Sequence, residues 1–141
     1  PASVMQSEGI HVAGTLEDLY RRSDYLSLHI PANNETRGSI GQALLSLMPK
    51  GACLINTARK EVINEPELEA IMAQRTDLKY ATDVAPGNMD ALKAQFDTRV
   101  FATTKKMGAE TQEANINAGL AAARQIEGYL LKGDKTFCLN K

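Results

Sequence analysis

Four short polar segments, each placed after an apolar run, carry the side chains of this sequence that are best suited to chemistry. They are residues 29–36, 57–60, 83–88 and 103–108. Among them are Arg59, Asp83 and the pair Lys105 and Lys106. A guanidinium can hold a carboxylate through two charge-assisted hydrogen bonds, and an ammonium can donate a proton. On residue type alone, the alternatives are a surface arginine, a turn-forming aspartate and a solvated lysine pair.

The elements that must position these side chains are predicted from periodicity. Strands are expected at residues 10–12, 25–30, 52–56, 78–84 and 99–103. Helices are expected at residues 15–22, 39–47, 65–74, 88–96 and 110–132. This alternation favours right-handed βαβ units and a parallel sheet that is covered on both faces. Ligands of such sheets bind beyond the carboxyl ends of the strands, where the four polar segments lie.

Composition excludes several classes of protein. The 141 residues are 43% hydrophobic and 23% charged, with a net charge of −1, which gives no general attraction to nucleic acid or to an anionic membrane. No apolar run approaches the roughly 20 residues of a membrane span, and the first residues, which have neither a basic start nor an apolar stretch, predict no signal peptide. Two cysteines and two histidines without an HExxH pattern predict no disulfide framework and no metal site. Because the chain starts at Pro1 without a methionine, we expect a piece of a longer protein.

The glycine signature of a dinucleotide site is missing from the chain. No G-x-G-x-x-G and no Walker A sequence occurs, and the nearest spacing is Gly38-x-x-Gly41. A dinucleotide fold needs that turn to bring backbone N–H groups to the pyrophosphate. The chain by itself therefore lacks half of a cofactor site.

Four motifs in order nevertheless resemble one family. They are YLSLHIP at 25–31, ETRG at 35–38, KGACLINTAR at 50–59 and DV at 83–84. The chain is similar to the D-2-hydroxyacid dehydrogenases over about residues 16–131 and, within them, to the phosphoglycerate dehydrogenase branch. The resemblance implies an α/β fold with a doubly wound parallel sheet, the second half of a Rossmann-type NAD-binding domain, in residues 1–108. Residues 109–141 would be a long helix and tail that return toward a substrate domain outside this chain.

The resemblance also implies roles for single residues. Arg59 matches the arginine that binds the carboxylate and carbonyl of the 2-keto acid. Asp83 matches the aspartate that accepts a hydrogen bond from the nicotinamide carboxamide, and the backbone of Thr57 and Ala58 would line the nicotinamide. The implied NAD contacts in full are His29, Ile30, Pro31, Thr36, Thr57, Ala58, Arg59, Asp83, Lys106, Gly108 and Ala109. The first three of these would form the wall of the adenine pocket.

Two departures from the family pattern concern the proton. The family usually places a catalytic histidine after the last strand; counting back from Gly108 puts Lys106 there, and counting from Thr104 selects Lys105. The glutamate that orients the histidine is replaced by Asn88. The two changes fit each other, because an ammonium has three donors and no tautomer to fix. A short branch of the family carries lysines in this loop. One lysine acting as a phosphate clamp remains an alternative.

The implied activity is NAD-dependent oxidation of 3-phospho-D-glycerate to 3-phosphohydroxypyruvate, in serine biosynthesis, by a cytoplasmic homodimer without nucleic-acid or membrane partners. The alternatives are a glyoxylate or hydroxypyruvate reductase of the same family and a catalytically inactive NAD-sensing module. We expect the chain to be inactive without the upstream half. The acidic residues of segment 65–69 are expected to be ordinary charges on a helix surface.

Overall fold

The computed structural model describes residues 5, 7–105 and 111–140. It divides into two compact units, Pro1–Lys105 and Lys106–Lys141, and each is described by itself. Lys106, Gly108 and Ala109, three of the predicted site residues, lie outside the described residues.

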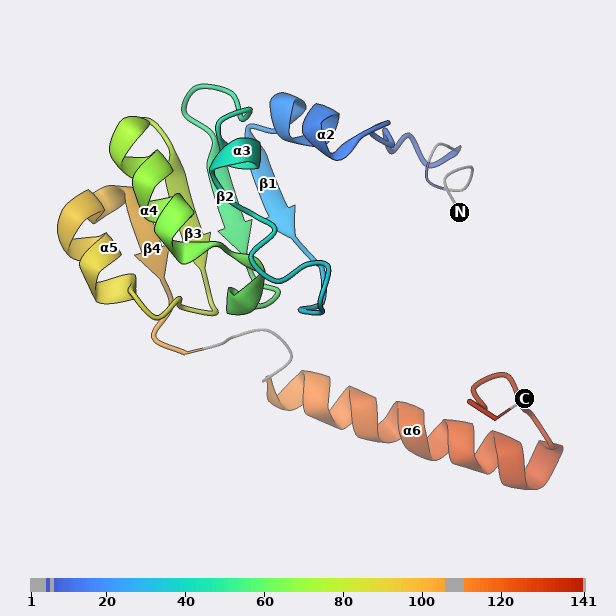
Figure 1. Ribbon diagram of the computed structural model, residues 1–141. Helices are drawn as coiled ribbons and strands as arrows, with labels where there is room; N and C mark the ends of the chain where they lie inside the picture. The colour runs from blue at the N-terminus through green and yellow to red at the C-terminus, as the bar shows by residue number, and fades with distance from the viewer. Residues whose placement is uncertain (1–4, 6, 106–110, 141) are drawn as a thin grey trace. The chain divides into compact units, whose positions relative to one another are not determined.

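The first unit alternates strands and helices (Figure 1). In chain order it contains α2 (Leu16–Arg22), β1 (Tyr25–Leu28), α3 (Gln42–Leu45), β2 (Cys53–Asn56), the 3₁₀ turn η1 (Lys60–Val62), α4 (Glu65–Gln74), β3 (Lys79–Thr82), α5 (Met89–Phe96), the 3₁₀ turn η2 (Asp97–Arg99) and β4 (Val100–Ala102). These elements confirm the predicted order, mostly with shorter bounds. The prediction for α3 was too long because Ile40 is still extended and bridges Ile63.

The strand predicted at residues 10–12 is wrong. No described strand pairs with this segment, and Ile10 and Val12 are 50% and 38% exposed. An apolar pattern forms a strand only where a neighbouring strand completes its hydrogen bonds.

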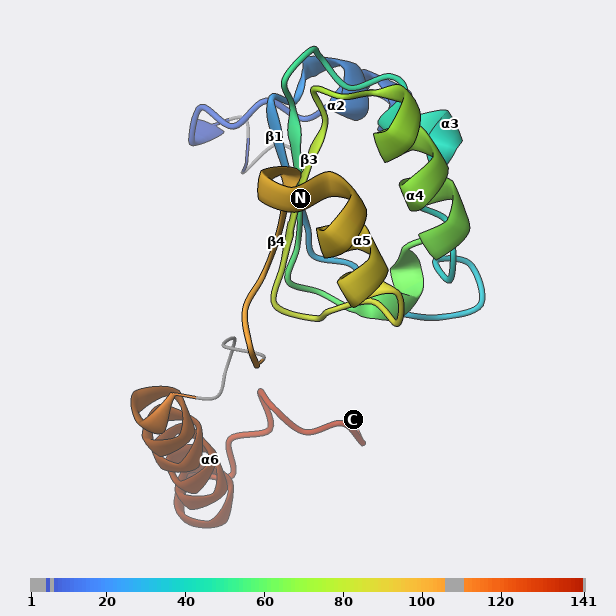
Figure 2. The same ribbon diagram turned by 90° about the vertical axis from the view of Figure 1, so that its left-hand side faces the viewer.

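The four strands form one parallel sheet in the order β1-β2-β3-β4. The sheet order follows the chain order, so right-handed crossovers place every connecting helix on the same face. Figure 2 shows the sheet nearly edge-on, with α3 and α4 on one side. Leu26, Leu54 and Tyr80 are buried on that face, whereas Tyr25 and Phe101 are 77% and 64% exposed on the other. The described residues of this unit therefore do not supply the cover that was expected on the second face.

A charged network ties together the amino ends of β2 and β3, away from the candidate site. Arg75 follows α4 and donates through Nη1 to the carbonyl oxygen of Met48 and through Nη2 to that of Pro49, each at 2.7 Å. Asp77 accepts from Arg75 and from the backbone N–H of Gly51, the latter at 2.7 Å. The hydrogen bonds from Arg75 and Gly51 hold the pKa of Asp77 well below its usual range.

The second unit consists of α6 (Gln112–Lys132) and a short tail. The Thr111 hydroxyl caps the helix by accepting from the backbone N–H of Ala114 at 3.1 Å. The helix ends at Gly133, where φ is +65°, a conformation that glycine adopts without strain. The prediction that this helix ends at about residue 132 is confirmed. Among the described residues, none of the helices has the length and apolar character needed to cross a membrane.

Candidate functional site

The parallel sheet gathers the predicted polar segments at one edge. The last residues of neighbouring strands lie in register, Leu28 with Asn56, Asn56 with Thr82, and Thr82 with Ala102. The next residue along each strand begins one of the four segments, and the arrowheads in Figure 1 all point toward this edge. Side chains far apart in the sequence are therefore close at the carboxyl ends of the strands, as expected.

A cavity of about 360 Å³ lies beside β1, between α2 and the segment that follows the strand. Three of the predicted NAD contacts, His29, Ile30 and Thr36, line it. Tyr20 lines it from α2, and its buried hydroxyl has no hydrogen-bond partner among the described residues. Burial raises the pKa of Tyr20 to about 12. The cavity is thus walled by apolar groups with a few polar atoms, a composition typical of small-molecule sites.

The segment after β1 is held by its own turn. The Thr36 hydroxyl accepts from the backbone N–H of Asn33 at 2.9 Å and donates to the carbonyl oxygen of Pro31. His29 is exposed, and its Nε2 lies 2.9 Å from the hydroxyl of Ser27. The four predicted contacts of this segment therefore lie within one compact turn, with Pro31 outside the lining of the cavity.

Arg59 lies in a turn that is held by hydrogen bonds with the buried side chain of Asn56. Asn56 is 0% exposed; its Nδ2 donates to the carbonyl oxygen of Arg59 at 3.0 Å, and its Oδ1 accepts from the backbone N–H of Ala58 at 3.1 Å. The Arg59 side chain is exposed, and its Nη1 donates to the carbonyl oxygen of Ala58 at 2.8 Å. The described salt bridges join other pairs, so in this part of the chain the Arg59 guanidinium has no carboxylate partner. It is available to an anionic ligand.

Asp83 lies next to that turn and is 9% exposed. Its backbone N–H donates to the carbonyl oxygen of Asn56 at 3.4 Å. The same oxygen accepts from the hydroxyl of Thr82 at 2.7 Å, and that hydroxyl accepts from the backbone N–H of Val84 at 3.0 Å. The ends of β2 and β3, which carry Arg59 and Asp83, are thus fastened to each other.

Asn56 and Thr82 were not predicted as site residues. Each is the last residue of its strand, is polar, and is buried on the face of the sheet that the helices cover. The sequence signal was present, since a polar residue closes the apolar runs that end at positions 56 and 82. Only the fold shows that their hydrogen bonds go to neighbouring segments of the site.

The expectation that the acidic residues of α4 are ordinary surface charges is wrong. Glu65 accepts from the backbone N–H of Gly87 at 3.0 Å, and Glu69 accepts from Nδ2 of Asn88 at 3.2 Å. Glu67 accepts from the backbone N–H of Gln42 at 2.8 Å. These carboxylates are half-buried because the loop before α5 and the start of α3 pack against α4. Glu65 and Glu69 fasten the loop that begins with Asp83, and Glu67 fastens the start of α3.

The predicted proton-transfer loop is described only up to Lys105. This residue is exposed, and its carbonyl oxygen accepts from the hydroxyl of Thr103 at 2.7 Å. The choice between Lys105 and Lys106 therefore stays a prediction. The described part of the chain contains no cluster of His, Cys, Asp and Glu that could hold a metal ion.

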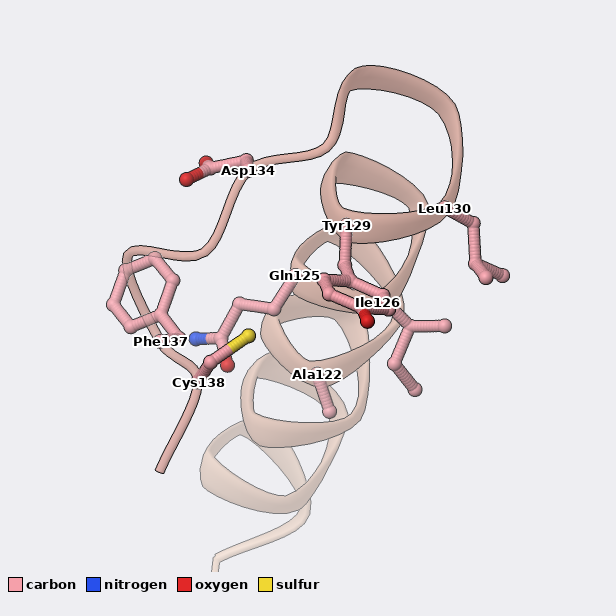
Figure 3. A pocket seen from close by; sticks show the side chains of 8 residues that line it. All are labelled: Ala122, Gln125, Ile126, Tyr129, Leu130, Asp134, Phe137 and Cys138. Atoms are coloured by element: carbon pink, nitrogen blue, oxygen red, sulfur yellow. The ribbon is translucent and has the colours of Figure 1, made fainter. Parts of the chain in front are cut away.

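A second cavity, of about 310 Å³, lies within the other unit, between α6 and the tail (Figure 3). It is lined by Ala122, Gln125, Ile126, Tyr129, Leu130, Asp134, Phe137 and Cys138. No predicted site residue belongs to it. The strand-end edge of the first unit is therefore the candidate site.

Comparisons with known proteins show the family to which the chain belongs. The sequence model of the family described as "D-isomer specific 2-hydroxyacid dehydrogenase, NAD binding domain" matches residues 1–115. The chain is 34% identical over 132 residues to D-3-phosphoglycerate dehydrogenase of Escherichia coli (strain K12), covering 89% of this chain and 32% of that protein. It is 32% identical over 118 residues to glyoxylate reductase of Aeropyrum pernix, covering 82% and 35%.

Among solved structures, the chain resembles NAD+-bound 3-phosphoglycerate dehydrogenase of Entamoeba histolytica, with a TM-score of 0.79 and 46% identity. The match covers 92% of this chain and 42% of that chain. The chain spans about a third of the length of the two curated relatives. Fold, motifs and family match all agree, and the chain belongs to the D-isomer specific 2-hydroxyacid dehydrogenase family, in the part that forms its NAD-binding domain.

Proposed function

We propose that this chain forms the second half of the NAD-binding domain of an enzyme that oxidises 3-phospho-D-glycerate to 3-phosphohydroxypyruvate. The observation that carries the proposal is the exposed guanidinium of Arg59, which has no carboxylate partner in the described residues and stands on a fixed turn beside Asp83. A planar guanidinium in that place suits the carboxylate and carbonyl of a 2-keto acid.

The residues at the strand ends fit an NAD molecule. The cavity beside β1 has apolar walls for an adenine ring, with the polar side chains of His29 and Thr36 among its lining residues. Asp83 would accept the carboxamide N–H of the nicotinamide, while Thr57 and Ala58 would line its ring. Bound NAD+ would supply the hydride acceptor for C2 of the substrate.

The protein's own chemistry would then be orientation and proton transfer. Arg59 holds the substrate carboxylate and carbonyl, which fixes C2 relative to the nicotinamide. Lys106 or Lys105 takes the proton of the 2-hydroxyl group during oxidation and returns it during reduction. An ammonium needs no carboxylate to orient it. This is consistent with Asn88 at the position of the family's orienting glutamate, where its amide is hydrogen-bonded to Glu69.

The rest of the enzyme would complete the site. An upstream half would bring the glycine turn for the pyrophosphate, and residues 109–141 would return toward a substrate domain. We place the enzyme in the cytoplasm as a homodimer, with a small-molecule substrate and no nucleic-acid or membrane partner. The chain of 141 residues alone would not turn over substrate, because it lacks the glycine turn.

The test is NADH oxidation by the full-length protein with 3-phosphohydroxypyruvate and, in parallel, with glyoxylate. Lys105→Ala and Lys106→Ala are assayed beside it, with NADH binding measured separately. We expect turnover with the phosphorylated keto acid that falls at least 100-fold in one lysine variant, with a much smaller change in NADH affinity. Preference for glyoxylate would assign the reductase activity of the same family instead.

The second candidate is an inactive NAD-sensing module. It is favoured by the loss of the family's histidine and by Asn88, which takes the place of the orienting glutamate and is hydrogen-bonded to Glu69. Tight NADH binding without turnover of either keto acid, and without any effect of the lysine variants, would support this candidate and reject the dehydrogenase.

A further inference from the structure

Asn56 lies between the turn that carries Arg59 and the segment that begins with Asp83. It is the last residue of β2, in register with Leu28 on one side and Thr82 on the other, and it is 0% exposed. A polar side chain in that position needs partners, because burying it without them costs free energy. Its partners are the backbone groups of the residues that follow it.

The side-chain amide of Asn56 uses a donor and an acceptor on the same turn. Nδ2 donates to the carbonyl oxygen of Arg59 at 3.0 Å, and Oδ1 accepts from the backbone N–H of Ala58 at 3.1 Å. A carboxylate of the same shape offers no donor to the Arg59 carbonyl, and an alanine offers neither group. Of these three side chains, only the amide satisfies both backbone groups.

The main chain of Asn56 contacts the end of β3, where the Asp83 segment begins. Its carbonyl oxygen accepts from the Thr82 hydroxyl at 2.7 Å and lies 3.4 Å from the backbone nitrogen of Asp83, which donates to it. One residue therefore fixes the backbone beneath Arg59 through its side chain and the start of the Asp83 segment through its carbonyl.

We propose that Asn56 is a positioning residue that aims the Arg59 guanidinium at the substrate carboxylate by closing the turn of residues 57–59. The inference rests on the proposed function, because it assumes that Arg59 binds a 2-keto acid. Without the amide, the Ala58 N–H loses its described partner and the Arg59 carbonyl keeps only the long hydrogen bond from the Val62 N–H at 3.4 Å, so the turn samples other conformations. A bidentate contact depends on placement to within a fraction of an ångström, so substrate binding suffers before folding does.

The test uses the full-length protein with Asn56→Ala, Arg59→Ala and the double variant. Leu54→Val is the matched control, because Leu54 is also fully buried in β2 but its side chain has no group that could hydrogen-bond to the turn. We expect Asn56→Ala to raise the KM for the keto acid at least tenfold while the Kd of NADH changes less than threefold. In the Arg59→Ala background, the same change should lower kcat/KM less than twofold further.

A purely structural role would give a different pattern. Losses of kcat/KM that multiply in the double variant, or a KM for Asn56→Ala within twofold of the parent, would overturn the proposal. A KM shift of similar size in Leu54→Val would also overturn it, since general loosening of β2 would then suffice.

Hydrogen–deuterium exchange separates this proposal from the proposed function. Asn56→Ala should accelerate exchange of the Ala58 amide, which donates to Asn56 Oδ1, at least tenfold, and Leu54→Val should not, whether or not the parent oxidises NADH. Faster exchange in a protein without turnover would uphold the role of Asn56 in the turn and reject only the keto acid as its ligand. Unchanged exchange in Asn56→Ala would overturn the inference even in an active enzyme.

Discussion

The side-chain amide of Asn88 donates a hydrogen bond to the carboxylate of Glu69 at 3.2 Å, linking the loop before α5 to the side of α4. One turn earlier on α4, Glu65 accepts from the backbone N–H of Gly87. The position at which the family resemblance places an orienting glutamate thus faces an acidic stretch of helix. A neutral amide suits that place, whereas a carboxylate would be repelled.

Asn88→Glu is therefore expected to destabilise the protein and not to improve its activity. The glutamate would lose the donor to Glu69 and add a like charge, at a cost of about 1–3 kcal/mol. Urea unfolding at pH 7 measures the loss, and Asn88→Gln, which keeps the amide, is the control and should lose less. Equal or greater stability of Asn88→Glu would contradict the role given to this contact.

Gly41 is predicted to be intolerant of a side chain. A Cβ built there would overlap Oε2 of Glu67, the carboxylate that accepts from the Gln42 N–H at the start of α3. Gly41→Ala must displace this carboxylate, and we expect a loss of about 1–3 kcal/mol in thermal or urea unfolding.

The control for that substitution is Gly14→Ala, because a Cβ at Gly14 would meet nothing within 4 Å. It should change the free energy of unfolding by less than about 0.5 kcal/mol. Equal effects of the two substitutions would show that the close approach of Glu67 does not matter.

Asp77 is expected to contribute to the stability of the protein against acid. Hydrogen bonds from Arg75 and from Gly51 N–H lower its pKa in the folded state, so its contribution is complete above the ordinary aspartate range. That contribution is lost as the pH falls from about 4 through the lower pKa of the folded state.

Asp77→Asn should therefore be less stable than the parent at pH 7, by about 1–3 kcal/mol, and the difference should shrink below about pH 4. Urea unfolding across pH 2 to 7 measures both variants. A difference that stays constant over this range would mean that the charge of Asp77 is not what stabilises the junction of β2 and β3.

Tyr20→Phe is expected to be tolerated in the absence of ligand. The hydroxyl is buried without a partner in the described residues, so its removal should cost less than about 0.5 kcal/mol at pH 7 and can stabilise the protein. The pKa of Tyr20 is about 12 in the folded state and about 10 in the unfolded state. Above about pH 10, ionisation of Tyr20 in the unfolded state should therefore lower the free energy of unfolding of the parent but not of Tyr20→Phe. Unfolding measured at about pH 8 and pH 11 tests this; a large loss in Tyr20→Phe at pH 8 would reveal a hidden partner.

The sequence predicted an element well where the residues that determine it lie within the element or next to it. The bounds of α4 matched the prediction because its signals are local: the Asn64 cap, Pro66 in the first turn and acidic residues at the start. The segment at residues 10–12 has a strand-like pattern but pairs with no strand in the part of the chain that the structure describes, and pairing is not encoded in the segment itself. A local pattern cannot report a missing neighbour.

The same distinction applies to the site. Arg59 and Asp83 were predicted from motif and strand position, and the sheet brings them to one edge. The roles of Thr82, Glu65 and Glu69 were not predicted, because they depend on hydrogen bonds to segments up to 26 residues away. Such contacts exist only once the strands are in register. The side chain of Asn56 bonds to residues two and three positions along, and its role was missed although its contacts are local.

The most direct test of the account is the keto-acid kinetics of Arg59→Ala and Arg59→Lys in the full-length protein, with NADH affinity measured on the same preparations. The account predicts that Arg59→Ala lowers kcat/KM for 3-phosphohydroxypyruvate roughly 100-fold, equivalent to about 3 kcal/mol, with a much smaller change in NADH affinity. Arg59→Lys should recover only part of this, because an ammonium keeps the charge but not the planar fork. A kcat/KM for Arg59→Ala within twofold of the parent would contradict the assignment of this edge of the sheet as the substrate site.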